Sequence, residues 1–338
     1  MKKNWIRLFA VLCAALILAG CSQSNSGEVS IGGASGGGTS ESALTFATGN
    51  EQGTYYAFGN VIAAQVSDAT DTAVTVTASQ GSRDNIQELQ SNRAQFAFVQ
   101  SDVMSYAYEG TNGFIAPVEN FSAVCAMYME QVQIVTLNPE IKSVSDLAGR
   151  RISVGDAASG VYFNAIDILD AYGIDISTGV KAVYESFSDS VESLLNGEID
   201  AAFIVAGAPT NAVTQLANEK QVYLVSLDEA HINALTAKSR YYVRSVIPAD
   251  AYSTPEDAVT VAVGAVVIAR DDVSTEDVYN FVSSVYDHLD DVTAASDKGA
   301  ELNLDFAASV TAVPYHQGAY NYFANQRRAV PLKEDSGH

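Results

Sequence analysis

The sequence has only three cysteines among its 338 residues, and this scarcity limits the chemistry that sulfur can supply. Cys13 and Cys21 lie in an N-terminal segment with the features of an export signal. Cys125 lies in an apolar run, where packing in a core is more frequent than catalysis. We therefore expect no disulfide, and a core large enough to stabilise an exported protein without one.

Catalytic and cofactor motifs are also missing. The sequence has no phosphate-binding loop, no H-E-x-x-H, no C-x-x-C and no dinucleotide fingerprint. The G-x-S-x-G pattern at 33–37 has no strand before it and no helix after it, so it is not a hydrolase elbow. The four histidines lack the spacing of metal ligands. We predict no cofactor, no bound metal and no catalytic residue.

Basic residues are scarce as well. The chain has 18 Lys and Arg against 40 Asp and Glu, a formal net charge of −22. Such a surface argues against binding to nucleic acid or to anionic lipid headgroups. It also repels anions at long range, so an anionic ligand would need a locally positive pocket.

The N-terminus has the pattern of a lipoprotein signal peptide, predicted over residues 1–21. Basic residues precede an apolar run at 8–19 that is too short to span a bilayer comfortably. Leu18-Ala19-Gly20-Cys21 looks like a lipobox, in which Cys21 is lipidated and becomes the mature N-terminus. A plain secretory signal is the alternative. Residues 22–43 are rich in Ser and Gly and read as a flexible tether.

The stretch 44–57 is the first candidate for a binding element. Residues 44–48 predict a strand, residues 49–53 a tight loop, and Thr54 the N-cap of a helix with apolar positions three or four residues apart. Such a helix directs free backbone N–H groups beyond the sheet edge, where they can bind a carboxylate or phosphate. An ordinary turn between strand and helix is the alternative.

The same unit recurs about 105 residues later. Residues 151–155 predict a strand and 156–160 a loop that leads into a second helix. Tyr55 follows Gly53 by two residues, and Tyr162 follows Gly160 by two. The strands and helices that come next also correspond. The chain is therefore expected to contain two βαβαβ halves, each with helix N-termini at one edge of a parallel sheet.

Polar residues follow several of the predicted strands, where ligands of open α/β sheets bind. Ser82 is a plausible N-cap, and Arg83 could clamp a carboxylate or simply pair with Asp84 or Asp102. Asp102 could equally cap the following helix. The candidate ligand-binding residues are Gly49, Gly53, Tyr55, Ser82, Arg83, Asn85, Gln100, Ser101, Asp102, Ser159, Gly160, Tyr162 and Gly207.

The connections between the halves are predicted from apolar runs. Residues 120–137 read as two strands with a bend near Glu130, and residues 260–269 as a strand that carries the chain back. Pro209 is a plausible first residue of a helix, and residues 275–289 have the pattern of an amphipathic helix. The resulting domain prediction is lobe 1 at 44–129 and 262–326, lobe 2 at 130–261 and a C-terminal tail at 327–338.

Six segments in order give the chain a resemblance to the TAXI family, the solute-binding proteins of TRAP (tripartite ATP-independent periplasmic) transporters. The segments are residues 48–59, 80–85, 96–103, 143–155, 196–203 and 314–323. The resemblance implies an α/β type II periplasmic-binding-protein fold with a ligand cleft between two lobes. It also implies delivery of a solute to TRAP membrane subunits, and ligands such as glutamate, glutamine or a 2-oxo dicarboxylate.

We therefore expect a monomeric, extracytoplasmic solute-binding protein that is anchored to the cell membrane by lipid and is not an enzyme. The expected ligand is a small carboxylate or amino acid, with no nucleic-acid partner. Two alternatives stay open: an exported enzyme such as a hydrolase, which needs a nucleophile and base in one cleft, and a surface interaction lipoprotein, which needs an exposed apolar patch.

Overall fold

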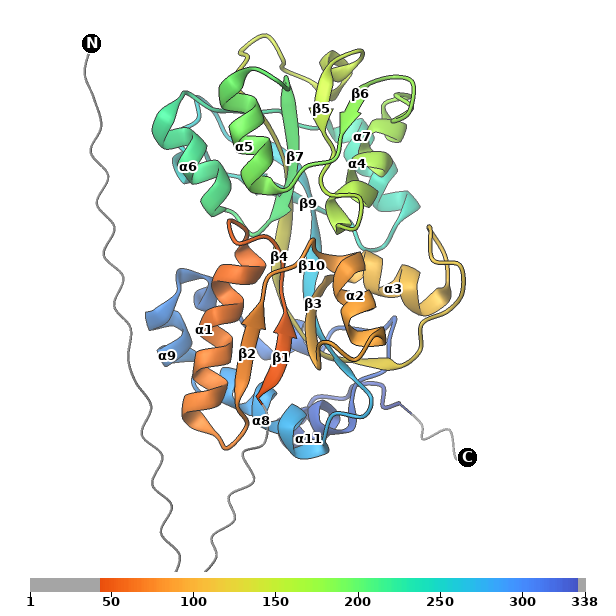
Figure 1. Ribbon diagram of the computed structural model, residues 1–338, viewed down its shortest axis with the longest axis vertical. Coiled ribbons are helices and arrows are strands. Elements are labelled where there is room, and N and C mark those ends of the chain that lie inside the picture. The colour runs from red at the N-terminus through yellow and green to blue at the C-terminus, as the bar shows by residue number, and fades with distance from the viewer. Residues whose placement is uncertain (1–42, 334–338) are drawn as a thin grey trace, which may run out of the picture. The chain divides into compact units, whose positions relative to one another are not determined.

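A computed structural model describes residues 43–333, and these form one long mixed sheet flanked by helices (Figure 1). The strand order is β2-β1-β3-β10-β4-β7-β5-β6, with β8 paired to β4 and β9 to β10. The strands are β1 (Leu44–Ala47), β2 (Val74–Thr77), β3 (Phe96–Gln100), β4 (Phe121–Thr136), β5 (Arg151–Ser153), β6 (Lys181–Val183), β7 (Ala201–Ala206), β8 (Tyr223–Leu224), β9 (Val243–Ile247) and β10 (Ala258–Arg270).

The helices follow the strands in the alternating order that the sequence predicts. The α-helices are α1 (Thr54–Ala69), α2 (Ser82–Gln90), α3 (Ser101–Glu109), α4 (Gly160–Ala171), α5 (Phe187–Asn196), α6 (Asn211–Glu219), α7 (Glu229–Lys238), α8 (Thr275–Tyr286), α9 (Leu289–Ala295), α10 (Leu304–Ala307) and α11 (Gln317–Asn325). The 3₁₀ helices are η1 (Val144–Leu147), η2 (Ala249–Ala251) and η3 (Asp297–Glu301). Within residues 43–333, no helix is long and apolar enough to cross a membrane.

Two groups of strands have their own hydrophobic cores. We call the part around β1–β3 lobe 1, where Phe46, Phe98 and Phe281 pack in one buried cluster. The part around β5–β7 is lobe 2, whose sheet has a cluster on each face. Along β7, Phe203 contributes to one cluster and Ile204 to the other, because successive side chains of a strand point to opposite faces. Cys125 is free and buried in lobe 1, as expected for a packing residue.

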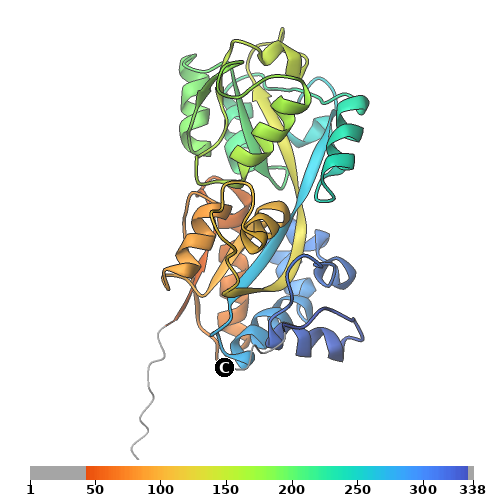
Figure 2. The ribbon, with the colours of Figure 1, turned by 90° about the vertical axis from the view of Figure 1, so that its right-hand side faces the viewer.

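The strands β4 and β10 run through both lobes and pair antiparallel along most of their length (Figure 2). The prediction of two strands with a bend near Glu130 is wrong, because β4 is one continuous strand of 16 residues. Glu130 and Gln131 form a polar pair in the middle of this mostly apolar strand. In the structure Glu130 accepts a hydrogen bond from Tyr55, and Gln131 accepts one from Ala208 N–H, so both side chains find partners without a bend.

Three helices begin at a different residue from the one predicted. In each case a hydrogen bond to another segment explains the difference. Gly53, not Thr54, is the N-cap of α1, because the Thr54 hydroxyl donates to another loop. Gly81, not Ser82, is the N-cap of α2, because the Ser82 hydroxyl accepts from Gln100 N–H.

The third helix start is that of α6. It begins at Asn211 and not at Pro209, which follows a cis peptide bond. The Thr210 N–H donates to the Tyr252 hydroxyl at 2.7 Å, so this residue is held outside the helix as its N-cap. The strand β10 and the helix α8 are confirmed, although α8 ends at Tyr286 and a separate short helix follows it.

Candidate functional site

A cavity of about 170 Å³ lies between the two lobes, at the carboxyl ends of the parallel strands. This is the edge at which ligands of open α/β sheets bind. The lining residues before β5 are Gly49, Asn50, Gly53, Thr54, Tyr55, Ser79, Gln80, Gly81, Ser82, Gln100 and Glu130, and those after it are Asp156, Ser159, Gly160, Val161, Glu185, Ser186, Phe187, Val205 and Ala206.

Four helices begin at this cavity. The helices α1 and α2 start there from lobe 1, and α4 and α5 start there from lobe 2. Their first N–H groups and their dipoles favour negative charge at the helix start, by about 0.3–1 kcal/mol each at exposed ends. The α4 and α5 starts are capped by Ser159 and Ser186, whereas α1 and α2 begin after glycines that provide no side-chain cap. The cavity can therefore accept an oxyanion through backbone groups.

Glu130 is the most deeply buried acid of the cavity, with 2% of its surface exposed. Its Oε2 accepts a hydrogen bond of 2.6 Å from the Tyr55 hydroxyl. Burial raises the pKa of Glu130 to about 8, although the Tyr55 hydrogen bond acts in the opposite direction. The Tyr55 ring stacks on Phe98, with 4.7 Å between the ring centroids, so this hydroxyl is held in place by lobe 1.

The lobes also meet at the cavity, where the Gln100 side chain lies against Gly160. A Cβ atom placed on Gly160 would lie 2.0 Å from Gln100 Oε1, so a larger residue at this position would displace the Gln100 amide. The Gln100 side chain is buried, and its Oε1 has no hydrogen-bond partner within the described part of the chain. This oxygen is an acceptor that a ligand could satisfy.

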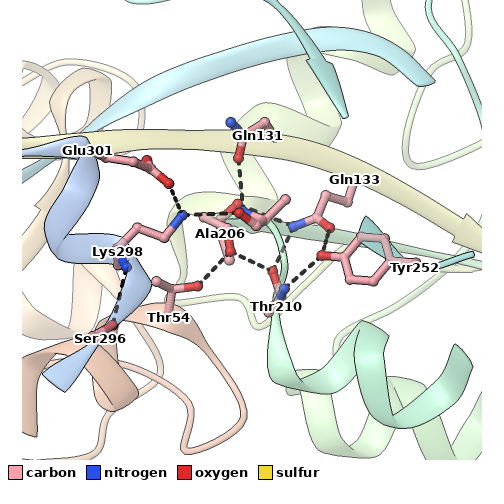
Figure 3. Close-up of polar contacts among 11 residues, drawn as sticks. Thr54, Gln131, Gln133, Ala206, Thr210, Tyr252, Ser296, Lys298 and Glu301 are labelled. Carbon is pink, nitrogen blue, oxygen red and sulfur yellow. Dashed lines mark hydrogen bonds and ion pairs between the residues drawn. The ribbon is translucent and has the colours of Figure 1, made fainter. Parts of the chain in front are cut away.

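A second interlobe contact surrounds the loop after β7 (Figure 3). The Thr54 hydroxyl donates to the Gly207 carbonyl at 2.8 Å, and Lys298 Nζ donates to the Ala208 carbonyl at 3.1 Å. Lys298 also forms an ion pair of 2.5 Å with Glu301. Because Thr54 and Lys298 belong to different segments of lobe 1, two separate elements hold the same loop of lobe 2.

A third interlobe contact is buried and polar. Asp102 at the start of α3 accepts a hydrogen bond of 2.9 Å from Asn164 of α4. Asn164 also donates to the Tyr242 hydroxyl, which in turn donates to Asp167. Burial raises the pKa of Asp102 to about 7, because the charged form is poorly solvated there.

The structure places part of the predicted set at the cavity. The residues that line it are Gly49, Gly53, Tyr55, Ser82, Gln100, Ser159 and Gly160. The others lie elsewhere, because their polar groups have different partners. Asn85 donates to the carbonyls of Thr48 and Phe98, Ser101 accepts from Gly264 N–H, and Gly207 accepts from Thr54. Asp102 is held by Asn164.

Arg83 and Tyr162 line a different hollow, on the flank of the two lobes. The Arg83 guanidinium donates to the Gly113 carbonyl at 3.2 Å and lies 5.7 Å from the centre of the Phe114 ring. Both groups are on the loop after α3, so the guanidinium points away from the main cavity.

Several lining residues were missed by the sequence reasoning. Glu130 is a charged residue inside an apolar run, and this contrast is the signal in the sequence that could have identified it. Ser186 and Phe187 follow β6 just as the predicted residues follow β5, so the position after the strand could have identified them. Among residues 43–333, no Lys or Arg lines the cavity, and no group of three or more His, Cys, Asp or Glu is placed to bind a metal.

Known proteins share this architecture. The model of the NMT1-like family matches residues 46–326. The structure is similar to that of MatC from Rhodopseudomonas palustris with bound malate, with a TM-score of 0.56, 13% identity, and coverage of 84% of this chain and 97% of that one. It is also similar to a structure described as a periplasmic transporter, with a TM-score of 0.51, 14% identity, and coverage of 86% and 98%. The expected fold class is confirmed: the chain belongs to the NMT1-like family and has the α/β type II periplasmic-binding-protein fold.

Proposed function

We propose that this protein is an extracytoplasmic solute-binding protein that captures a small molecule by closure of its two lobes. The observation that carries the proposal is the cavity, which is lined by residues of both lobes and lies at the starts of four helices. Its volume of about 170 Å³ suits a small solute rather than a polymer. The family membership and the fold support the same reading.

The finer assignment is to the TAXI family, with delivery of the solute to the membrane subunits of a TRAP permease. The ligand class is a small carboxylate or an amino acid, and the malate bound by MatC is one small carboxylate held by this fold. The lobes of the proposal are residues 44–129 with 262–326, and residues 130–261, in a monomer. Closure is expected about the β4 and β10 segments that connect them, as a hinge motion around the ligand.

Binding is tested by thermal shift of the purified protein with a panel of amino acids and small carboxylates. A ligand at 100 times its Kd adds about 2.7 kcal/mol to the apparent stability, which is easily detected. X-ray scattering with and without a saturating hit then tests closure, and identical curves would count against it. Conversion of the ligand during the assay would favour the exported enzyme instead.

The lipid anchor is proposed at Cys21, which lies outside the described residues, as do the signal peptide over 1–21 and all but the last residue of the tether at 22–43. We expect Cys21→Ala to release the protein from the membrane fraction, because acylation of this residue would be the attachment. A variant that still fractionates completely with membranes would show that the lipobox assignment is wrong.

A further inference from the structure

The cavity has a surplus of hydrogen-bond acceptors. The Tyr55 hydroxyl is the partner of Glu130 Oε2, and no other side-chain hydrogen bond to this carboxylate occurs among the described residues. Gln100 Oε1 and Glu185 Oε2 are buried with no partner in the same part of the chain. All three side chains line the cavity. Buried acceptors without donors cost free energy, so the missing donors are expected on the ligand.

Among the described residues, the ionisable side chains that line the cavity include carboxylic acids but no basic group. Glu130, Asp156 and Glu185 line it, whereas no Lys or Arg of residues 43–333 does. Lys298 is the cation that acts on Glu130, and its ammonium is already paired with Glu301 and bonded to the Ala208 carbonyl. A dianionic solute would therefore meet helix starts but no basic side chain, and would also face three carboxyl groups.

We propose that Glu130 selects solutes that carry a protonated amine, whose ammonium group donates to the free oxygen of this carboxylate. The helix starts then hold the oxyanion end of the same molecule, so that the preferred ligand has both an amine and an acid. The inference rests on the proposed solute-binding function and narrows its ligand class, because it places 2-oxo dicarboxylates among the poor ligands.

The titration of Glu130 gives the proposal a distinct pH signature. The groups that act on this carboxyl are Tyr55 of α1, Tyr128 of β4, Asp102 of α3 and Lys298 of η3. With a pKa of about 8, Glu130 is largely protonated at pH 7 in the empty cavity. An ammonium ligand requires the ionised form and displaces the proton, so its affinity should rise with pH, by up to about tenfold per unit below pH 8. A ligand that places an oxyanion at Glu130 requires the protonated form, and its affinity should fall as pH rises.

The experiment uses matched probes that differ by the amine alone: L-glutamate with glutarate, and L-glutamine with glutaramate. Calorimetry between pH 6 and 8 on the full chain without its signal measures both affinity and proton release. We expect the amine member of a pair to bind more tightly and to release a proton. Glu130→Gln should weaken this binding by about tenfold to 150-fold, the loss expected for a hydrogen bond to a charged group. Glu51→Gln removes an equal charge from an exposed position beside the cavity and should leave the affinity unchanged.

The outcomes separate this inference from the proposed function. Tighter binding of glutarate and glutaramate than of L-glutamate and L-glutamine would overturn the role of Glu130 but leave a solute-binding protein. An affinity for the amine-bearing probes that falls as pH rises would do the same. Equal binding of both members at every pH also overturns it. Binding of neither class, in the wider panel as well, removes the proposed function and this inference with it. The pH dependence is measured on the wild-type protein, so the test does not depend on the folding of the Glu130 variant.

Discussion

The loop after β1 and the loop after β5 both lead into a helix at the cavity, yet their tyrosines have different surroundings. The Tyr55 hydroxyl is buried against Glu130, whereas Tyr162 lies on the flank beside Tyr184, with 5.7 Å between the ring centroids. In the sequence, each tyrosine follows the last glycine of its loop by two residues.

The start of the helix explains the difference. The helix α1 begins after Gly53, so Tyr55 is its second residue, whereas α4 begins at Gly160 itself, so Tyr162 is its third. One residue along an α-helix turns a side chain by about 100°. Two loops with the same spacing can therefore direct the same residue type to different faces, and only one half places its tyrosine in the cavity.

The largest expected effect is a loss of ligand affinity on substitution of Gly160, compared with Gly53, the last glycine of the other loop. Gly160→Ala should weaken binding of the solute found in the screen by about tenfold or more, because its new Cβ would collide with Gln100 across the cleft. Opening of the lobes relieves this collision, so the thermal stability without ligand should change little. Gly53→Ala should have a smaller effect, since the nearest atoms to its Cβ, Asn50 O at 3.1 Å and the Phe187 ring at 3.3 Å, have to move by only a few tenths of an ångström. Calorimetry that finds full affinity in Gly160→Ala would show that the cleft does not close to this distance.

The tyrosines are compared by removing one hydroxyl at a time. Tyr55→Phe should lower the free energy of unfolding by about 1–3 kcal/mol, because the Glu130 carboxyl loses its donor while still buried. The Tyr55 hydrogen bond lowers the pKa of Glu130, so the loss should grow as pH rises towards 8 and the carboxyl ionises. Tyr162→Phe should change the stability by less than about 0.5 kcal/mol. Denaturant unfolding at pH 6 and pH 8 measures both, and equal losses would contradict the comparison.

The residue between glycine and tyrosine is Thr54 in one half and Val161 in the other. Thr54→Val makes the halves alike and removes the 2.8 Å hydrogen bond to the Gly207 carbonyl. We expect a loss of about 0.5–1.5 kcal/mol, the usual net contribution of one hydrogen bond. Because this bond crosses between the lobes, the loss should be found in solute affinity measured by calorimetry. An unchanged affinity would mean that the bond is not part of closure.

The smallest effect is expected at Arg83, which the sequence made a candidate ligand clamp. Arg83→Ala should leave the solute affinity unchanged and lower the stability by about 0–1 kcal/mol, because the guanidinium contacts Gly113 and Phe114 rather than the cavity. Glu130→Gln, measured in parallel with the same solute, gives the loss of affinity expected when a residue inside the cavity is changed. A large loss of affinity for an acidic ligand in Arg83→Ala would instead show that Arg83 binds the carboxylate of the ligand.

The repeat of strand, glycine-containing loop and helix could be predicted from the sequence because it depends on local patterns. Alternation and spacing of apolar residues predicted β1, α1, β5 and α4, and the glycines marked the loops between them. Seven of the thirteen predicted ligand-binding residues line the cavity for this reason, since carboxyl ends of parallel strands meet at one edge. The sequence did not predict that β4 is one continuous strand, because the hydrogen-bond partners of Glu130 and Gln131 lie far away in the chain.

By itself the sequence predicted an α/β chain with two similar halves and the edge of the sheet where the cavity lies, since these follow from periodicity and from turn residues, and the type II fold was expected from the family resemblance. Only the tertiary structure decided which side chains face that edge. Glu130 is 75 residues from Tyr55, and Gly160 is fitted to Gln100 of the other lobe. The direction of each side chain depends on the residue at which its helix begins and on the partner that its polar atoms find, and both are set by contacts between distant segments.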